Sequence, residues 1–186
     1  YMQEMHELAH ALDGYGRYTT QAVCVDGQVG WKSDLIAWNF YPLWYTDSGY
    51  AELVAGIYDD FRSDPRYAQY LGVGISEYGA GANIEHHTDQ LVRPETTGQW
   101  HPEEWQNYVH EQALLAYAQT DFLWGNSPWN LFDFGSGARD EGDQKGINDK
   151  GFITFDRSVK KDVFYLYKAN YSQVPFVYLA EKRFDP

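Results

Sequence analysis

A single glutamate, Glu77, stands where an apolar run gives way to glycines. The run is Leu71-Gly-Val-Gly-Ile-Ser76, and the residues after Glu77 are Tyr-Gly-Ala-Gly81. A carboxylate at the end of a buried strand faces a bound molecule instead of the core, so Glu77 is a catalytic candidate. The alternative is a strand-end glutamate that is solvated or paired with a lysine, and spacing alone leaves both readings open.

Two further apolar runs end in polar aromatic residues and amides. One is Ile36-Ala-Trp-Asn-Phe-Tyr-Pro-Leu-Trp-Tyr45, and the other is Phe122-Leu-Trp-Gly-Asn-Ser-Pro-Trp-Asn-Leu-Phe-Asp-Phe134. A tyrosine hydroxyl beside a carboxylate can donate a hydrogen bond that keeps the carboxylate ionised and oriented. A tryptophan face can stack on the C–H face of a pyranose while amides such as Asn39 hold its hydroxyl groups. Aromatic packing at the rim of a sheet is the alternative for any single ring.

The elements that must position these residues alternate between helix and strand. Hydrophobic periodicity predicts helices at 2–12, 50–62, 102–118 and 159–169, strands at 19–25, 35–40, 71–76 and 122–134, and strand-like runs at 151–155 and 175–180. Strands buried on both faces that alternate with helices indicate a parallel sheet, which leaves a doubly wound fold or an eight-stranded barrel. No glycine-rich phosphate loop follows a strand, so a nucleotide-binding doubly wound fold has no support. Four strands cannot close a barrel alone.

Charge and composition exclude several classes of protein. The chain has 186 residues, with 14 Lys and Arg against 27 Asp and Glu, and the net charge of −13 repels a phosphate backbone. We therefore expect no nucleic-acid partner, and we expect no membrane partner because no apolar stretch approaches the length of a membrane span. The aromatic content of 18% is a weak indication of carbohydrate binding. Cys24 is the one cysteine, and its apolar neighbours predict a buried, inert thiol.

Adjacent histidines, His86 and His87, are the pair that could suggest a metal. Neighbouring side chains point in different directions, and no carboxylate spacing supports a site around them. We expect no metal and no cofactor.

Three motifs, taken together in this order, resemble glycoside hydrolase family 2. They are Ser76-Glu-Tyr-Gly-Ala80, Trp129-Asn-Leu-Phe-Asp-Phe134 and Asn148-Asp-Lys-Gly-Phe-Ile-Thr-Phe-Asp-Arg157. The segments 98–103, 141–143 and 160–170 look most like the β-galactosidase branch of that family. The resemblance covers nearly the whole chain. It implies an α/β fold that is the C-terminal half, about strands five to eight, of a TIM (β/α)8 barrel, and a retaining, exo-acting hydrolase of terminal β-galactosides.

The resemblance also implies roles for individual residues. Glu77 would be the nucleophile, Tyr41 the phenol that hydrogen-bonds it, and Trp129 the platform under the sugar. The other expected substrate contacts around these three are Asn39, Trp44, Tyr45, His86 and Asn130. The expected partner is therefore a carbohydrate substrate.

The second catalytic group of such an enzyme is missing from this sequence. A retaining glycosidase needs two carboxyl groups about 5–5.5 Å apart. In the family, the acid/base follows an asparagine at the end of strand four, and no Asn-Glu pair occurs here. Glu4 and Glu7 fall on the predicted first helix and cannot serve. We therefore expect the isolated chain to be inactive and to need the N-terminal half of the barrel as its partner.

The motifs do not all indicate the same sugar. An Asn-x-Lys pair, here Asn148 and Lys150, is the feature by which β-glucuronidases of the family hold the sugar carboxylate, and an ammonium group suits a carboxylate. The same Asn-Asp-Lys-Gly string occurs in β-galactosidase-like members, and the surrounding segments favour a galactoside. A β-glucuronidase and a non-catalytic carbohydrate-binding fragment are the alternatives, and a purely structural α/β domain is a third.

The chain divides near residue 172 in this interpretation. Residues 1–172 form the half barrel, and residues 173–186 form a linker and the first strand of a following β-sandwich domain. Analogy to exported relatives alone favours a periplasmic or secreted location.

Overall fold

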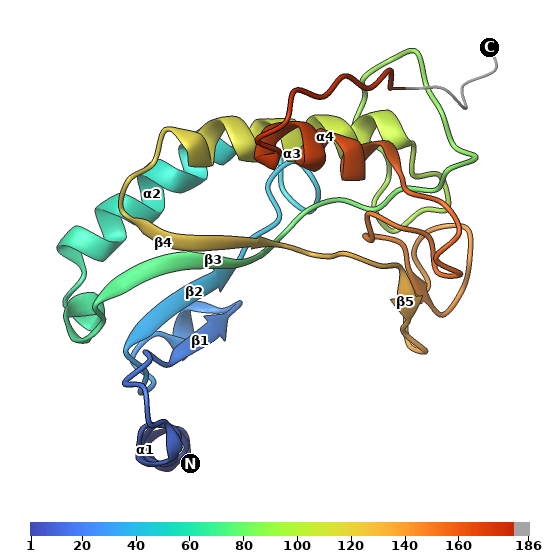
Figure 1. Cartoon of the computed structure of the whole chain (residues 1–186). Helices are drawn as coiled ribbons and strands as arrows, with labels where there is room; N and C mark the ends of the chain where they lie inside the picture. Colours follow the sequence, from blue (N-terminus) through green and yellow to red (C-terminus); the bar gives the residue numbers. More distant parts are fainter. Residues whose placement is uncertain (181–186) are drawn as a thin grey trace.

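A computed structural model describes residues 1–180 of the chain (Figure 1). Its centre is a parallel sheet in which four strands lie in the order of the sequence, β1-β2-β3-β4. These strands are β1 (Thr20–Val23), β2 (Leu35–Asn39), β3 (Gly72–Tyr78) and β4 (Leu123–Pro128). A strand lies at each of the four predicted places, although the fourth ends at Pro128 and not at Phe134. Because the four run in parallel, their carboxyl ends meet at one edge of the sheet.

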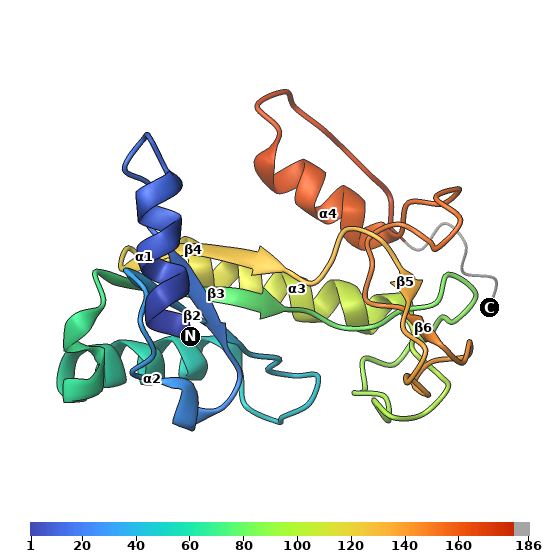
Figure 2. The same cartoon turned by 90° about the horizontal axis from the view of Figure 1, so that it is seen from below.

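The helices cover one side of this sheet, with one exception. They are α1 (Met2–Leu12), α2 (Tyr50–Ser63), α3 (Glu103–Ala118) and α4 (Asp162–Tyr171). Helices α2, α3 and α4 lie on the same side of the sheet, whereas α1 stands apart, beyond β1 (Figures 1 and 2). None of the helices in residues 1–180 has both the length and the apolar character that a membrane span needs.

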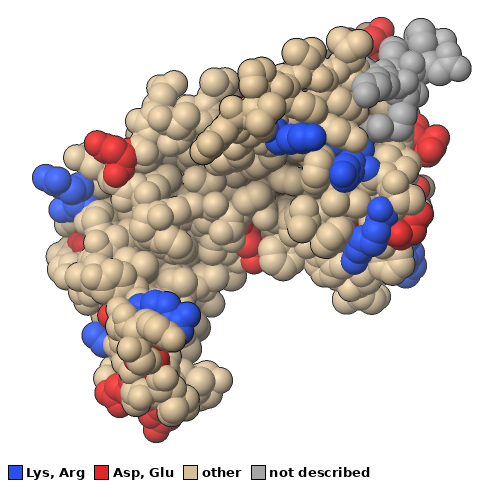
Figure 3. Space-filling model, in the orientation of Figure 1, with Lys and Arg blue, Asp and Glu red and all other residues tan. Residues whose placement is uncertain are grey.

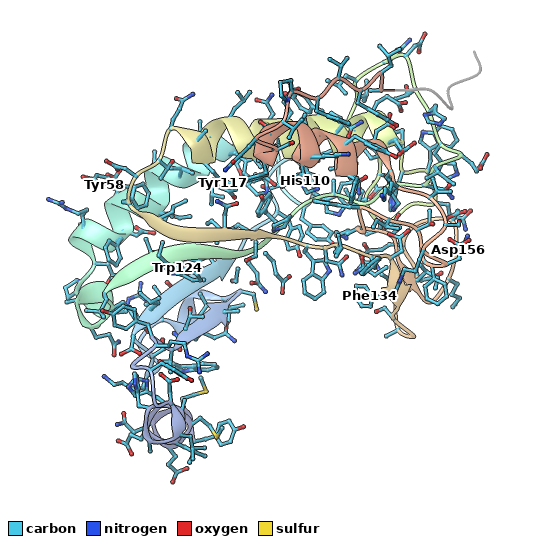
Figure 4. All side chains as sticks on the ribbon, in the orientation of Figure 1. Tyr58, His110, Tyr117, Trp124, Phe134 and Asp156 are labelled. Atoms are coloured by element: carbon cyan, nitrogen blue, oxygen red, sulfur yellow. The ribbon has the colours of Figure 1, made fainter. Side chains whose placement is uncertain are left out.

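The core lies between the sheet and its helical layer. Ile36, Val73 and Ile75 are completely buried there, together with Val109 and Ala113 from α3. In Figure 4, Tyr117 and His110 lie within this layer, whereas Trp124 of β4 lies at the sheet. Burial of the strand side chains against α3 makes the sheet a rigid support for whatever projects from its edge.

The opposite face of the sheet is partly covered by one large ring. Trp124 reaches across β3, and its indole Nε1 donates to the carbonyl oxygen of Ile36 at 3.1 Å. A Cβ atom at Gly74 would stand 2.6 Å from this indole, so the strand can pass beneath the ring only with glycine at that position. Trp124 remains 44% exposed, so this face of the sheet is only partly covered in the described structure.

The prediction of a buried Cys24 is wrong, because its side chain is exposed. Strand β1 pairs only with β2 and forms the edge of the described sheet. Only one of its faces is covered, so burial alternates along the strand, and Cys24 follows buried Val23 on the solvent side. An apolar run does not distinguish such an edge strand from one that is buried on both faces.

Beyond the carboxyl ends of the strands, the chain forms a region of loops. A short antiparallel pair, β5 (Phe134–Gly135) and β6 (Ile147–Asn148), is the regular structure within it. The predicted strand at 151–155 is wrong. The amide N–H groups of Phe152 and Ile153 donate to carbonyl oxygens of Asn130 and Leu131 in the loop after β4, so they join two loops instead of extending a ladder.

Residues 175–180, the predicted first strand of a following β domain, are not paired in a sheet in this structure, and Val177 and Leu179 are exposed. The segment instead packs back on α4, where the ring of Tyr178 stacks on Tyr165 with centroids 3.9 Å apart. An apolar alternation predicts a strand only where another strand is available to pair with it. The rest of the predicted second domain, residues 181–186, lies outside the described residues, and the boundary near 172 stays a prediction.

Candidate active site

Glu77 lies at the carboxyl end of β3, and Tyr41 lies just past the end of β2. The register of the two strands shifts by one residue after Trp38, so that Asn39 pairs with Glu77 and the amide of Phe40 donates to the carbonyl of Glu77 at 2.9 Å. The Tyr41 hydroxyl then donates to Oε2 of Glu77 at 2.6 Å. Burial and this hydrogen bond raise the pKa of the Tyr41 hydroxyl, so Tyr41 keeps its proton and acts as a donor to the carboxylate.

Asn39 is oriented by its neighbour on β3. The hydroxyl of Ser76 donates to Oδ1 of Asn39 at 2.6 Å, which fixes the carbonyl side of the amide. Asn39 therefore stands beside Glu77 with its orientation set by the sheet and not by solvent. The structure brings Asn39, Tyr41 and Glu77 together, as the strand-end argument predicted.

Trp129 follows β4 and meets the end of β3. Its amide donates to the carbonyl of Tyr78 at 2.8 Å, and its ring packs edge-on against Phe134 of β5. A Cβ atom at Gly79 would lie 2.8 Å from the Trp129 carbonyl oxygen, and Gly79 has φ +147°. Only glycine permits both this backbone conformation and this close approach, so Gly79 lets Trp129 sit directly beside the strand that carries Glu77.

Asn130 and Lys150 are tied together through the backbone. The amide of Asn130 donates to the carbonyl of Lys150 at 3.0 Å, and the side-chain Oδ1 of Asn148 accepts from the amide of Lys150 at 3.1 Å. Oδ1 of Asn130 is buried without a hydrogen-bond partner among the described residues. A buried acceptor of this kind is able to receive a ligand hydroxyl.

The side chain of Lys150 is almost completely buried, at 1% exposure. Its ammonium donates to the Tyr45 hydroxyl at 3.0 Å and lies 5.2 Å from the centre of the Trp44 ring and 5.9 Å from that of Tyr41. Aromatic faces stabilise a cation at such distances. Trp44 is itself fully buried, so in this structure it supports Lys150 from behind instead of facing a ligand. Tyr45 is half exposed and lies between Lys150 and the surface.

Two residues of the 139–141 loop complete this cluster, and the sequence reasoning missed both. The Arg139 guanidinium donates to the Tyr45 hydroxyl at 3.1 Å and also pairs with the carboxylate of Glu141. Oε2 of Glu141 lies 3.9 Å from the Lys150 ammonium. We name Tyr45, Arg139, Glu141 and Lys150 the loop cluster; its three charged groups sum to +1. The Glu141-Gly-Asp143 segment resembles the family, but nothing in its spacing places it against Tyr45, some 96 residues earlier.

His86 lies on another side of this region. Its ring stacks on Trp100 with centroids 4.3 Å apart, and its Nδ1 accepts from the amide of His101 at 3.1 Å. Burial lowers the pKa of His86, which favours the neutral ring. These contacts orient His86 toward Trp100 and His101, and the expected contact with substrate stays a prediction.

Buried ion pairs hold the loops from below. Lys161 Nζ donates to Oδ1 of Asp133 and to the carbonyl oxygens of Ala82 and Asp149 at 2.6–2.8 Å. The side chain of Asp149 in turn accepts from Nδ1 of His101 at 2.5 Å. Burial raises the pKa of Asp133 to about 6 against the opposing effect of Lys161. A cavity of about 430 Å³ adjoins these groups, and its lining includes Glu141 but neither Tyr41 nor Glu77.

Charge is unevenly distributed on the molecule. On the face shown in Figure 3, charged side chains gather around the end that carries α1 and around the opposite, loop-bearing end, with a largely uncharged surface between them. In Figure 4, Phe134 and Asp156 mark the loop-bearing end, beyond the carboxyl ends of the strands. The candidate site thus combines a sheet edge with one carboxylate and a loop region rich in ionic groups.

Known proteins are similar to this chain in sequence and fold. No protein-family model matches the chain. A β-glucuronidase of Bacteroides fragilis is 47% identical over 184 residues, which are 98% of this chain and 26% of the relative. A solved structure from Bacteroides fragilis, assigned provisionally as a β-galactosidase, is 31% identical with a TM-score of 0.85, over 98% of this chain and 27% of the other.

A second solved structure shares the fold. It is a galacturonidase of glycoside hydrolase family 2 from Eisenbergiella tayi, 24% identical with a TM-score of 0.67, over 85% of this chain and 27% of the other. The chain is thus similar in sequence to a β-glucuronidase, and its fold is that of part of a family 2 glycosidase. It spans about a quarter of the length of these relatives, and its parallel sheet corresponds to part of their TIM barrel.

Proposed function

We propose that this chain belongs to glycoside hydrolase family 2 and supplies strands five to eight and the nucleophile of a retaining, exo-acting β-glycosidase whose substrates are terminal β-glucuronides. The observation that carries the proposal is the hydrogen bond of 2.6 Å between the Tyr41 hydroxyl and Glu77 at adjacent strand ends. A module that only bound carbohydrate would not need a carboxylate held in this way. Trp129 and Asn130 beside it provide a stacking face and an unpaired acceptor for a sugar.

The chemistry follows from the donor that Tyr41 supplies. Because its hydroxyl engages Oε2, the other oxygen of Glu77 is left to attack the anomeric carbon while the bond to the leaving oxygen breaks. The product is a glycosyl ester on Glu77, which water then hydrolyses with retention of configuration. Tyr41 orients the carboxylate before attack and donates to it again when it leaves.

The acid/base group belongs to another part of the barrel in this proposal. It must protonate the leaving oxygen and later activate water, and it must stand about 5–5.5 Å from Glu77. The isolated chain is therefore inactive, and losing general-acid assistance alone costs about 10²–10⁴-fold in rate. Turnover by the isolated chain that disappears in Glu77→Gln would contradict this part of the proposal.

Three observations support a glucuronide over the galactoside that the motifs alone favoured. The loop cluster carries a net positive charge beside Tyr41, which suits a substrate carboxylate. Asn148 and Lys150 are held together at its base. The relative that is 47% identical is a β-glucuronidase.

A β-galactoside is the second candidate, and one contact favours it. Glu141 already lies 3.9 Å from the Lys150 ammonium, so part of the positive charge is neutralised before any substrate binds. A neutral sugar would leave this pair intact, whereas a uronate would have to share or displace it. The relative of 31% identity that is provisionally assigned as a β-galactosidase is consistent with this reading.

A pair of matched substrates tests the proposal. The complete enzyme that contains this chain is assayed with 4-nitrophenyl β-glucuronide and 4-nitrophenyl β-galactoside under identical conditions. We expect kcat/KM to be larger for the glucuronide, and Glu77→Gln to abolish both activities. A larger value for the galactoside would transfer the proposal to the second candidate. Full activity of Glu77→Gln on either substrate would refute the proposed nucleophile.

A further inference from the structure

A second polar cluster lies at the amino-terminal end of the sheet, away from Glu77. His6 and His10 are one turn apart on α1, and Asp34 immediately precedes β2. One ligand-type atom from each of these three side chains lies within 4.8 Å of the other two. Thr19, which precedes β1, places its hydroxyl among them.

Hydrogen bonds already converge in this cluster. Nε2 of His10 lies 2.7 Å from Oδ2 of Asp34, and the Thr19 hydroxyl donates to the same oxygen at 2.9 Å. The Thr19 hydroxyl lies 2.8 Å from Nδ1 of His6. The cluster therefore presents two imidazole nitrogens, one carboxylate and one hydroxyl toward a common centre.

The carboxylate is the anionic member of the set. Oδ2 of Asp34 also accepts from the amide of Thr19 at 2.7 Å, so the backbone holds the carboxylate in place beside the two rings. Two imidazoles and one carboxylate are a donor set that suits zinc and its neighbours among the divalent transition metals.

Helix α1 makes few other contacts within residues 1–180. None of its residues is buried, and Met5, Leu8 and Leu12 on its apolar stripe are exposed. The edge-on contact between the His6 and His10 rings, with centroids 4.7 Å apart, keeps both imidazoles on the side that faces Thr19 and Asp34. In Figures 1 and 2 the helix stands off the sheet as a separate arm. A link at this cluster would fix the position of the whole helix.

We propose that His6, His10 and Asp34 form a structural binding site for a divalent transition metal such as Zn²⁺, which fastens α1 to the amino-terminal ends of β1 and β2. The Thr19 hydroxyl or a water molecule completes a four-coordinate shell. The site is independent of the function proposed for Glu77.

The adjustments that binding requires are small. Ligand atoms about 2.0–2.1 Å from zinc in a tetrahedral shell stand roughly 3.3 Å apart. The hydrogen-bonded pairs, now at 2.7–2.9 Å, must open by about half an ångström, and pairs as wide as 4.8 Å must close by about 1.5 Å, which ring rotations on an unburied helix allow. A metal binds the unprotonated nitrogen of an imidazole, so it would replace the hydrogen bonds that His6 and His10 now make to Thr19 and Asp34.

Calorimetric titration of Zn²⁺ into the full chain tests the site. The protein is prepared without a polyhistidine tag and stripped of metal with EDTA. We expect one Zn²⁺ per chain, and we expect His6→Gln or His10→Gln to weaken binding by more than about tenfold, since even outer partners of metal ligands contribute that much. Glu7→Gln, which removes a carboxylate from the same helix outside the cluster, is the matched control and should bind as the unmodified chain does.

Cobalt provides a readout that a hydrogen-bonded latch cannot give. Co²⁺ bound by this site should show the visible absorption of a tetrahedral ion, and each histidine variant should lose it while keeping the helical content measured by circular dichroism. Binding that is weak and of no fixed stoichiometry, or histidine variants that bind as tightly as the unmodified chain, would overturn the proposal and leave the cluster as a set of hydrogen bonds without a metal.

Discussion

Two polar groups at the carboxyl edge of the sheet differ in how they are built. Tyr41 and Glu77 project from neighbouring parallel strands, and backbone pairing of β2 with β3 fixes their separation. The loop cluster of Tyr45, Arg139, Glu141 and Lys150 is drawn from loops about 100 residues apart and is held by ionic contacts. We infer that the sheet fixes the chemistry, whereas the loops set the choice of sugar. Variants of the two groups should therefore differ in which kinetic constant they change.

The largest effect is expected at Glu77. Glu77→Gln keeps the shape of the side chain but removes the nucleophile, so kcat of the complete enzyme should fall on the order of 10⁴-fold or more. The control is Glu85→Gln, which changes an exposed glutamate in the loop after β3 and should leave kcat near its original value. A loss of less than tenfold would place the nucleophile elsewhere.

The second largest effect is expected from removal of the Tyr41 hydroxyl. Tyr41→Phe keeps the ring but deprives Glu77 of its donor, and kcat should fall on the order of 10²–10³-fold with little change in KM. Tyr45→Phe is the informative partner, because its hydroxyl meets Lys150 and Arg139 instead of Glu77. If both phenylalanine variants lowered kcat equally, the distinction between the two groups would fail.

Lys150→Met should act on selectivity. Loss of a charge-assisted contact predicts a fall of about 10–100-fold in kcat/KM for a β-glucuronide, with a much smaller change for a β-galactoside. Lys145→Met, an exposed lysine of the same loop region, is the control. Kinetics with both 4-nitrophenyl glycosides measure the ratio. An equal loss on both sugars would make Lys150 a structural residue only.

A smaller effect of opposite sign is expected at Glu141. Glu141→Gln removes the carboxylate 3.9 Å from Lys150, so affinity for a glucuronide should increase and KM should fall, by up to about fivefold. Asp143→Asn changes the charge of the same loop without contact to Lys150 and should have no such effect. A rise in KM for the glucuronide after Glu141→Gln would mean that Glu141 orders the loop and does not compete with substrate.

The last prediction concerns stability instead of catalysis, and the residue beneath the strand ends. Burial lowers the pKa of His110 to about 3, and a Cβ atom at Gly79 would stand 3.2 Å from this ring. Between about pH 6.5 and pH 3 the unfolded chain binds one more proton at this residue, so the free energy of unfolding falls by up to about 1.4 kcal/mol per pH unit as the pH falls. Urea denaturation of His110→Gln across this range should show a shallower dependence, and an unchanged slope would contradict the assignment.

Much of the sheet-built group could be predicted from the sequence. Apolar runs that alternate with helices indicate parallel strands, and parallel strands bring Tyr41 and Glu77 to one edge whatever the loops do. The loop cluster could not be predicted in the same way. Contacts from Tyr45 to Arg139 and Lys150 depend on loop conformations that no period in the sequence encodes.

His6 and His10 illustrate a different limit of prediction from sequence. Their spacing of four on a predicted helix was visible and places both on one face. Nothing in the sequence showed that Asp34 and Thr19 would meet that face, because the helix and the strand are joined by a loop of undetermined path. The prediction that Cys24 is buried was wrong for a different reason. Its apolar run was correctly assigned to a strand, but the sequence did not show that this strand lies at the edge of the sheet.

Trapping with a 2-fluoro glycoside tests the central claim most directly. The complete enzyme is treated with 2-deoxy-2-fluoro-β-glucuronyl fluoride and with its galactosyl counterpart, digested, and mapped by mass spectrometry. We predict that the label is an ester on the peptide containing Glu77, and that Tyr41→Phe slows labelling without moving it. A label on any other carboxylate, with Glu77 unmodified, would contradict the account.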